Sequence, residues 1–228
     1  MKDLQRVGGM AGFIAAATVV VGLGMFATLL TDYTTGDPTT GESVAFLADN
    51  EASIFIWNLV TLIVFSLALV PFALALRERL KPGSPALMNT ATAFGLIWAG
   101  LLLAGGMVLN VSSATIVDLH NTDPAQAESL WLAVDSVANG LTGGMEIVGS
   151  VWVLVASLAV LRTAVLPRAA GYLGLVMAVA GLATIVPALE AVGAVFGLGL
   201  IVWFAWLGTV MLRPPTKAST AATVADRH

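Results

Sequence analysis

The chain has 228 residues, of which 58% are hydrophobic and 11% are charged, with a formal net charge of −4. A soluble globular domain carries about 25% charged residues, so this composition argues against an ordinary soluble protein. Because the sequence contains no cysteine, disulfides, thiolate metal sites and c-type haem attachment are excluded.

Six stretches are long enough to cross the hydrocarbon core of a membrane as a helix, which takes about 20 apolar residues. They are Val7–Leu30, Ile54–Leu76, Leu87–Val111, Leu141–Leu161, Ala170–Leu189 and Ala191–Leu212. Helices are expected because a backbone in lipid must satisfy its own hydrogen bonds, and the period-two alternation of a membrane β-barrel is absent. The predicted fold is all-α: a six-helix transmembrane bundle over residues 1–212, followed by a disordered cytoplasmic tail at 213–228.

The basic residues alternate along the chain with acidic connections. All ten lie at the N-terminus, in the second and fourth connections, or in the tail: Lys2, Arg6, Arg77, Arg79, Lys81, Arg162, Arg168, Arg213, Lys217 and Arg227. The charged residues of the first, third and fifth connections are all acidic. Under the positive-inside rule, this pattern predicts a multi-pass protein of the plasma membrane with both termini in the cytoplasm.

The two long outward connections are both predicted to be partly helical. The segment "TTGESVAFLADNEAS" indicates a short amphipathic helix before the second span. In "NTDPAQAESLW", Asp123 is a suitable N-cap and Pro124 a suitable first helical residue. Two courses stay open for residues 124–140: the helix runs unbroken into the fourth span, or it bends at Asn139–Gly140 or Gly143–Gly144 and lies along the membrane surface.

A single carboxylate, Glu146, lies inside a predicted span. Asp135, Asn139, Thr142 and Glu146 are spaced by four, three and four residues, so one continuous helix would place them on one stripe. Glu146 precedes Arg162 by 16 residues, which puts it about 24 Å above the cytoplasmic edge and just under the outer surface. Ionisable groups in membranes are functional candidates by default, although many polar groups only bond a neighbouring helix.

Other predicted spans bring polar residues to a similar depth. Asn58 lies near the outer end of the second span, Asn110 near that of the third, and Glu190 between the last two spans. Together with the stripe they predict an outward-facing polar vestibule that binds a ligand. His120 in the third connection is a weak candidate metal ligand, because a metal site needs several converging ligands; no metal site is predicted.

Several kinds of active site are absent from the sequence. No predicted span contains lysine or histidine, which argues against a Schiff base or a haem held between helices. No P-loop, G-x-S-x-G or H-E-x-x-H motif is present, and no cofactor is expected. The glycine pairs Gly8/Gly12, Gly140/Gly144 and Gly193/Gly197 have the spacing that lets helices approach closely, within a bundle or in a homodimer.

Three segments carry a family resemblance: "QRVGGMAGFIAAATVVVG", "LADNEASIFIWNLVTLIVFSLALVPFALALRERLKP" and "VLPRAAGYLGLVMAVAG". Together they resemble DUF4386, a family of bacterial integral membrane proteins built on a domain of unknown function. The sharpest part is a Leu-Pro-Arg-x-x-Gly pattern at Leu166, Pro167, Arg168 and Gly171. The resemblance implies a six-helix bundle and no known activity, so no catalytic residue is carried over from it.

Three functional hypotheses follow from the residues. The first is a non-enzymatic protein whose vestibule binds a small amphiphile or lipid, or a partner protein; the second is a small, proton-coupled transporter that uses Glu146. The third is an enzyme acting on a lipid or isoprenoid; Asp135 and Glu146 would be about 16 Å apart along one helix, which is too far for them to act as a pair. Membrane lipids and a small hydrophobic or amphiphilic ligand are the expected partners, and nucleic acid is not.

Overall fold

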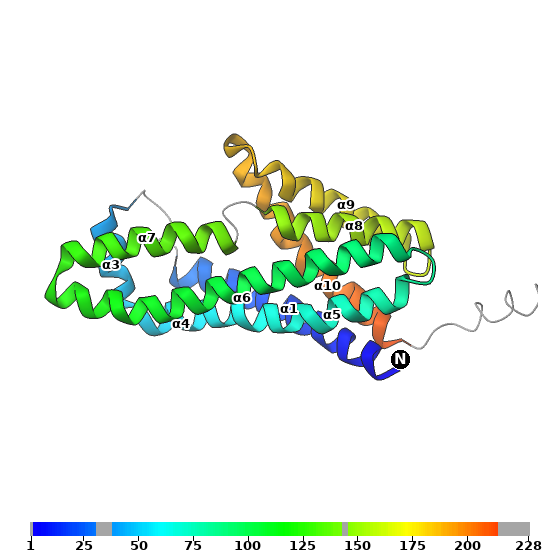
Figure 1. Ribbon diagram of the computed structural model, residues 1–228, viewed down its shortest axis with the longest axis horizontal. Coiled ribbons are helices and arrows are strands. Elements are labelled where there is room, and N and C mark those ends of the chain that lie inside the picture. Colours follow the sequence, from blue (N-terminus) through cyan, green and yellow to red (C-terminus); the bar gives the residue numbers. More distant parts are fainter. Residues whose placement is uncertain (1, 31–37, 143–145, 214–228) are drawn as a thin grey trace, which may run out of the picture.

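The computed structural model describes residues 2–30, 38–142 and 146–213, and the regular structure within these ranges is helical throughout (Figure 1). In chain order the elements are α1 (Lys2–Leu29), α3 (Thr40–Asp49), α4 (Glu51–Asn58), η1 (Leu59–Val64), α5 (Phe65–Leu80), α6 (Pro85–Thr122), α7 (Pro124–Thr142), α8 (Ile147–Thr163), α9 (Arg168–Ala183), η2 (Pro187–Val192) and α10 (Gly193–Leu212). The prediction of an all-helical protein is confirmed.

Five helical stretches in the described ranges are long and apolar enough to cross a membrane: Asp3–Leu29, Glu51–Leu80, Pro85–Thr122, Pro124–Thr163 and Pro187–Leu212. The fourth of them runs across residues 143–145, which lie outside the described residues. Most of the predicted tail, residues 214–228, also lies outside them. A membrane-type helical protein is therefore supported, with span limits that differ from the predicted ones.

The predicted fifth span differs most from the structure. Instead of running to Leu189, its helix α9 ends at Ala183 and has 16 residues, a length of about 24 Å. Pro187 explains the early end, since proline lacks an N–H group and disfavours helical geometry in the residue before it. The chain then forms η2, a 3₁₀ helix, before α10 begins.

The long helices surround a centre filled with aromatic rings. In contact order around the bundle, α1 packs on α10, α10 on α9, α9 on α8, α8 on α6, α6 on α5, and α5 again on α1. Trp152, Trp203, Phe72 and Phe204 are almost fully buried inside, and the Trp152 and Trp203 ring centroids are 5.4 Å apart. The indole of Trp203 also donates a hydrogen bond to the carbonyl oxygen of Ala170 (3.1 Å), which ties α10 to α9.

Glycine shapes the contacts of α1 with its neighbours. A Cβ on Gly8 would collide with the Cβ of Ala75, and one on Gly12 would lie 2.9 Å from the carbonyl oxygen of Phe204. The first predicted glycine pair therefore packs within the bundle. Gly140 and Gly197 have nothing within 4 Å, and Gly144 lies outside the described residues. A homodimer through those two pairs stays a prediction.

A second group of helices extends beyond the bundle on the left of Figure 1. We call it the distal lobe: α3, α4, the C-terminal half of α6, and α7. With 38 residues, α6 is about 57 Å long, nearly twice the roughly 30 Å of a hydrocarbon core. The lobe has its own apolar cluster, in which Val44, Leu47, Ile116 and Ala127 are buried.

Helix α7 resolves part of the question left open for residues 124–140. Asp123 caps it as predicted, since its carboxylate accepts a hydrogen bond from the amide of Gln126 (3.2 Å). The helix continues without a bend through Asn139–Gly140 to Thr142 and packs along α6. The alternative bend at Gly143–Gly144 falls outside the described residues.

Helix α3 occupies the first long connection. Thr39 accepts a hydrogen bond from the amide of Glu42, while the Glu42 carboxylate accepts one from the Thr39 amide (2.8 Å), which completes a capping box. These hydrogen bonds from Thr39 hold the pKa of Glu42 below its ordinary value of 4.5. The buried face of α3 carries Val44 and Leu47 and packs against α6 and α7.

Candidate functional site

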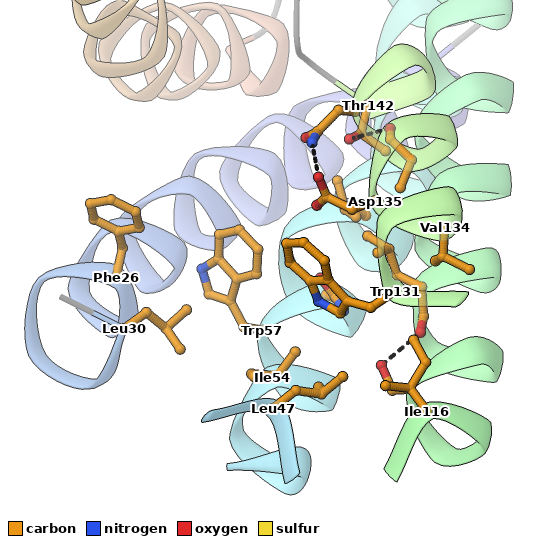
Figure 2. Close-up of a pocket in the computed structure, with 16 residues that line it drawn as sticks. Phe26, Leu30, Leu47, Ile54, Trp57, Ile116, Trp131, Val134, Asp135 and Thr142 are labelled. Carbon is orange, nitrogen blue, oxygen red and sulfur yellow. Dashed lines mark hydrogen bonds between the residues drawn. The ribbon is translucent and has the colours of Figure 1, made fainter. Parts of the chain in front are cut away.

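A cavity of about 230 Å³ lies where the distal lobe joins the bundle (Figure 2). Its walls come from α1, α3, α4, η1, α6 and α7, which belong to two parts of the sequence, residues 26–62 and 109–142. An engineered cavity of about 150 Å³ already holds benzene. This cavity therefore has room for a small molecule, below the roughly 300–1,000 Å³ of drug-sized sites.

Most of the cavity wall is apolar. The aliphatic and phenyl side chains that line it include Phe26, Leu30, Leu47, Ile54, Leu62 and Ile116. Two tryptophans add large aromatic surfaces: Trp57 reaches in from α4 and Trp131 from α7 (Figure 2). The Trp57 indole donates a hydrogen bond to the carbonyl oxygen of Gly22 (3.1 Å), which fixes this ring against α1.

One face of α7 brings polar groups to the same cavity. Asp135, Asn139 and Thr142 all line it, as their helical spacing predicts. The Asn139 amide donates to the Asp135 carboxylate (2.9 Å), and the Thr142 hydroxyl donates to the carbonyl oxygen of Ala138 (2.9 Å). This helix therefore presents a carboxylate whose orientation is set by its neighbour one turn away.

Asn58 is the most deeply buried polar residue of the cavity wall, with 2% of its surface exposed. Its side chain makes no hydrogen bond with any residue that the structure describes. The Asn58 amide atoms are not among the fully buried, unpartnered polar atoms of the described residues, so they retain some accessible surface, and Asn58 lines the cavity. Asn58 also stands where α4 passes into η1, a π-helix over Leu59–Val64, and π-helical turns are frequent at functional sites.

Glu146 lies away from the cavity, contrary to the stripe expected from the sequence. It directly precedes α8, is half-buried, and is not among the residues that line the cavity. Its amide donates a hydrogen bond to the Thr184 hydroxyl (3.2 Å), between α8 and α9. The helical period relates Asp135 to Glu146 only along one continuous helix, whereas α7 ends at Thr142 and α8 starts at Ile147.

The remaining predicted site residues are also separate from the cavity. Asn110 donates to the carbonyl oxygen of Phe55 (3.4 Å) and so links α6 to α4, and Glu190 is exposed on η2. His120 lies in the last turn of α6. Within the described ranges, no group of three or more histidine, aspartate or glutamate side chains is placed to hold a metal ion.

The two tryptophans of the cavity wall, Trp57 and Trp131, were not among the site residues predicted from the sequence. Trp131 stands four residues before Asp135, so it extends the polar stripe of α7 by one turn, and this spacing was a readable signal. Trp57 precedes Asn58, but its position on the wall depends on how α4 packs against α1. No sequence pattern indicated the π-helix.

The segments that build the cavity contain no lysine and no arginine. None occurs between Arg6 and Arg77, or between Lys81 and Arg162. Of the groups that line the cavity, only the Asp135 side chain is ionisable. The electrostatic character of the site is therefore negative, with hydrogen-bonding groups from Asn58 and Asn139 beside it.

Comparison with known proteins adds a family and no activity. A family model described as "Domain of unknown function (DUF4386)" matches residues 7–209, which runs from α1 almost to the end of α10. Searches among curated proteins and among solved structures find no match.

Proposed function

The chain belongs to the family Domain of unknown function (DUF4386), and we propose that it is a membrane protein that binds a small amphiphilic molecule in the cavity between its bundle and its distal lobe. The observation that carries the proposal is the composition of the cavity wall. The wall is largely apolar, yet Asn58 lines it, and the side-chain amide of this residue has no hydrogen-bond partner among the described residues. A ligand with an apolar body and one polar end would contact the apolar wall and hydrogen-bond the Asn58 amide.

The proposal includes the topology. The chain crosses the plasma membrane six times, with α9 as a short fifth span, the distal lobe outside the cell and both termini in the cytoplasm. The basic residues support this orientation, because Arg77, Arg79, Arg162 and Arg168 are all near helix ends on the side away from the distal lobe (Figure 1). At that end Arg79 donates to the carbonyl oxygen of Val210 (3.0 Å), which joins α5 to α10.

The cavity favours binding over the transport and enzyme hypotheses. Both of those depend on Glu146, which lies at the start of α8 and does not line the cavity. Asp135 and Glu146 are on separate helices, so the wall supplies one carboxylate and no acid pair.

The test uses the full-length protein in lipid nanodiscs with fluorine-labelled tryptophan, read by fluorine NMR. The probe is naphthylmethanol, which has an aromatic body and one hydroxyl. We expect it to shift the signals of Trp57 and Trp131 in a saturable manner and to leave that of Trp203, fully buried in the bundle, unchanged. Each signal is assigned by replacing that tryptophan with phenylalanine.

A matched pair of variants locates the binding. Ala138 is 2% exposed and lines the cavity, so the larger side chain of Ala138→Leu fills part of it. This variant should bind naphthylmethanol about tenfold more weakly, a loss of about 1.4 kcal/mol. Ala133→Leu makes the same change on an exposed position of α7 and should leave the affinity unchanged. Signals of Trp57 and Trp131 that stay fixed at saturating probe would refute the proposed function.

A further inference from the structure

The charge of Asp135 lacks a basic counterpart. Its carboxylate accepts one hydrogen bond, from the neutral amide of Asn139, and makes no other hydrogen bond or ion pair with the described residues. No lysine or arginine exists on the segments that form the walls. Asp135 is only partly buried, so water can solvate its carboxylate in the unliganded protein and a positive group of a ligand can pair with it.

The aromatic walls are suited to the same kind of group. Trp131 is one helical turn from Asp135 on the same face of α7, and Trp57 stands on the α4 side of the cavity (Figure 2). Tryptophan is the aromatic residue that attracts cations most strongly over its ring face, by about 0.5–2 kcal/mol depending on desolvation. A cavity lined by one carboxylate and two indoles is suited to an ammonium group.

The surroundings of the cavity reinforce this preference over a longer range. The charged residues of the distal lobe are all acidic: Glu42, Asp49, Glu51, Asp118, Glu128 and Asp135. A recess in a surface of one charge sign concentrates ions of the opposite sign at its entrance. The lobe therefore attracts cations and repels anions before any contact is made.

The cavity also limits what else the ligand carries. A phosphate or carboxylate would enter next to Asp135 without a basic partner on the wall, which opposes phospholipids and fatty acids. About 230 Å³ accommodates one compact apolar body, with Phe26 and Leu30 at its far side from α7. The Asn58 carbonyl lines the same space and can accept a hydrogen bond from an ammonium, which has up to three N–H groups.

We infer that the ligand of this cavity is a small organic cation, an amine on a compact apolar body, whose ammonium group lies against Asp135 between Trp57 and Trp131. This inference rests on the proposed binding function and adds the charge of the ligand to it.

The experiment compares three probes of one size in the full-length, fluorine-labelled protein: naphthylmethylamine, naphthylmethanol and naphthoic acid, which are cationic, neutral and anionic at neutral pH. We expect the amine to bind at least about tenfold more tightly than the alcohol, and the acid to bind more weakly than both. Asp135→Asn keeps a hydrogen-bond acceptor for Asn139. In this variant the affinity for the amine should fall to within about twofold of the affinity for the alcohol.

Glu146→Gln is the matched control, since it also replaces a carboxylate by an amide but outside the cavity, and it should preserve the preference for the amine. Equal affinities for amine and alcohol in the unmodified protein, or a preference that survives Asp135→Asn, would overturn the inferred charge and leave the binding function standing. If no probe moves the Trp57 and Trp131 signals, the binding function fails as well.

A further arm separates a free amine from a lipid headgroup. Phosphatidylethanolamine carries an ammonium beside a phosphate, so the amine titration is repeated in nanodiscs with and without this lipid. Unchanged affinity supports a free, phosphate-free cation. Competition by the lipid would overturn that assignment and identify the headgroup as the source of the ammonium.

Discussion

At the scale of single residues, Asn58 connects the stability of the protein with its binding site. The residue is 2% exposed, and no described residue forms a hydrogen bond with its side-chain amide. The proposed ligand would therefore bind an amide that contributes no side-chain hydrogen bond to the unliganded fold.

The Asn58→Leu variant is therefore informative. Leucine has a similar size and no polar atoms, so the unliganded protein should keep its unfolding free energy or gain up to about 1 kcal/mol. The same change should weaken naphthylmethanol, because the wall loses its amide. Denaturant unfolding of the protein in mixed micelles measures the first effect, and fluorine NMR the second.

The control is Asn121→Leu, at an exposed position of α6 whose amide bonds only its own helix, through the carbonyl oxygen of Val117 (3.1 Å). It should change neither quantity. A loss of stability in Asn58→Leu would show that the amide is satisfied in the folded protein and would remove the main support for the proposed site.

Glu146 illustrates a limit of reasoning from residue spacing. It is the carboxylate that hydropathy singles out, yet it contacts α9 through its backbone rather than lining the cavity. Asp135, which belongs to the same predicted stripe, lines the cavity. The difference arises because spacing fixes directions within one helix and gives no information across the end of a helix.

At the scale of the helices, local signals were sufficient wherever they act within one element. Asp123 and Pro124 predicted the start of α7. The basic residues Arg77, Arg79, Arg162 and Arg168 lie in the first or last turn of helices, as their positions beside the apolar runs predicted. Apolar runs gave the third span as Leu87–Val111, but α6 continues to Thr122, where Ile116 packs in the apolar cluster of the distal lobe against α3 and α7. Tertiary contacts of this kind, the π-helix and the meeting of six elements around the cavity leave no periodic trace in the sequence.

Helix α3 provides a test at this scale. It contributes Leu47 to the cavity wall, and a capping box fixes its first turn. Thr39→Ala removes the N-cap and should destabilise the start of α3 by about 0.5–2 kcal/mol. Hydrogen exchange of the α3 amides, expressed as protection factors, measures the change. Thr40→Ala, one residue inside the helix, is the control and should have little effect.

The same box predicts a pH dependence. The folded-state pKa of Glu42 lies below its ordinary value of 4.5, because the Thr39 backbone amide and hydroxyl donate to the carboxylate. A lowered pKa stabilises the folded form above the ordinary value, and that contribution is lost as the pH falls through the folded pKa. Protection of α3 should therefore be constant above about pH 5 and fall at more acidic pH, and the fall should be absent in Glu42→Gln.

At the scale of the whole molecule, charge and shape divide the protein into two ends. The basic residues within the described ranges lie near the helix ends opposite the distal lobe, and the charged residues of the lobe are acidic (Figure 1). The aromatic centre of the bundle holds the long helices together, and the cavity forms where the lobe joins them. Under the proposed topology, the cavity faces the outside of the cell and the basic helix ends face the cytoplasm.

The absence of native cysteine allows the orientation and the cavity to be tested with single thiols. Val134 lines the cavity, Ser129 is exposed on α7, and Ala86 is exposed at the start of α6, on the basic side. Each is replaced by cysteine in turn, in a functional expression host. Intact cells are then treated with a membrane-impermeant maleimide, with and without naphthylmethylamine.

The most direct measurement is the labelling rate of the Val134→Cys variant. We predict that the maleimide reacts with it from outside intact cells and that the amine slows the reaction, whereas Ser129→Cys is labelled without protection and Ala86→Cys only after permeabilisation. If Val134→Cys is labelled only in permeabilised cells, the cavity faces the cytoplasm and the proposed orientation is contradicted. If it is labelled from outside at the same rate with and without the amine, binding in the cavity is contradicted.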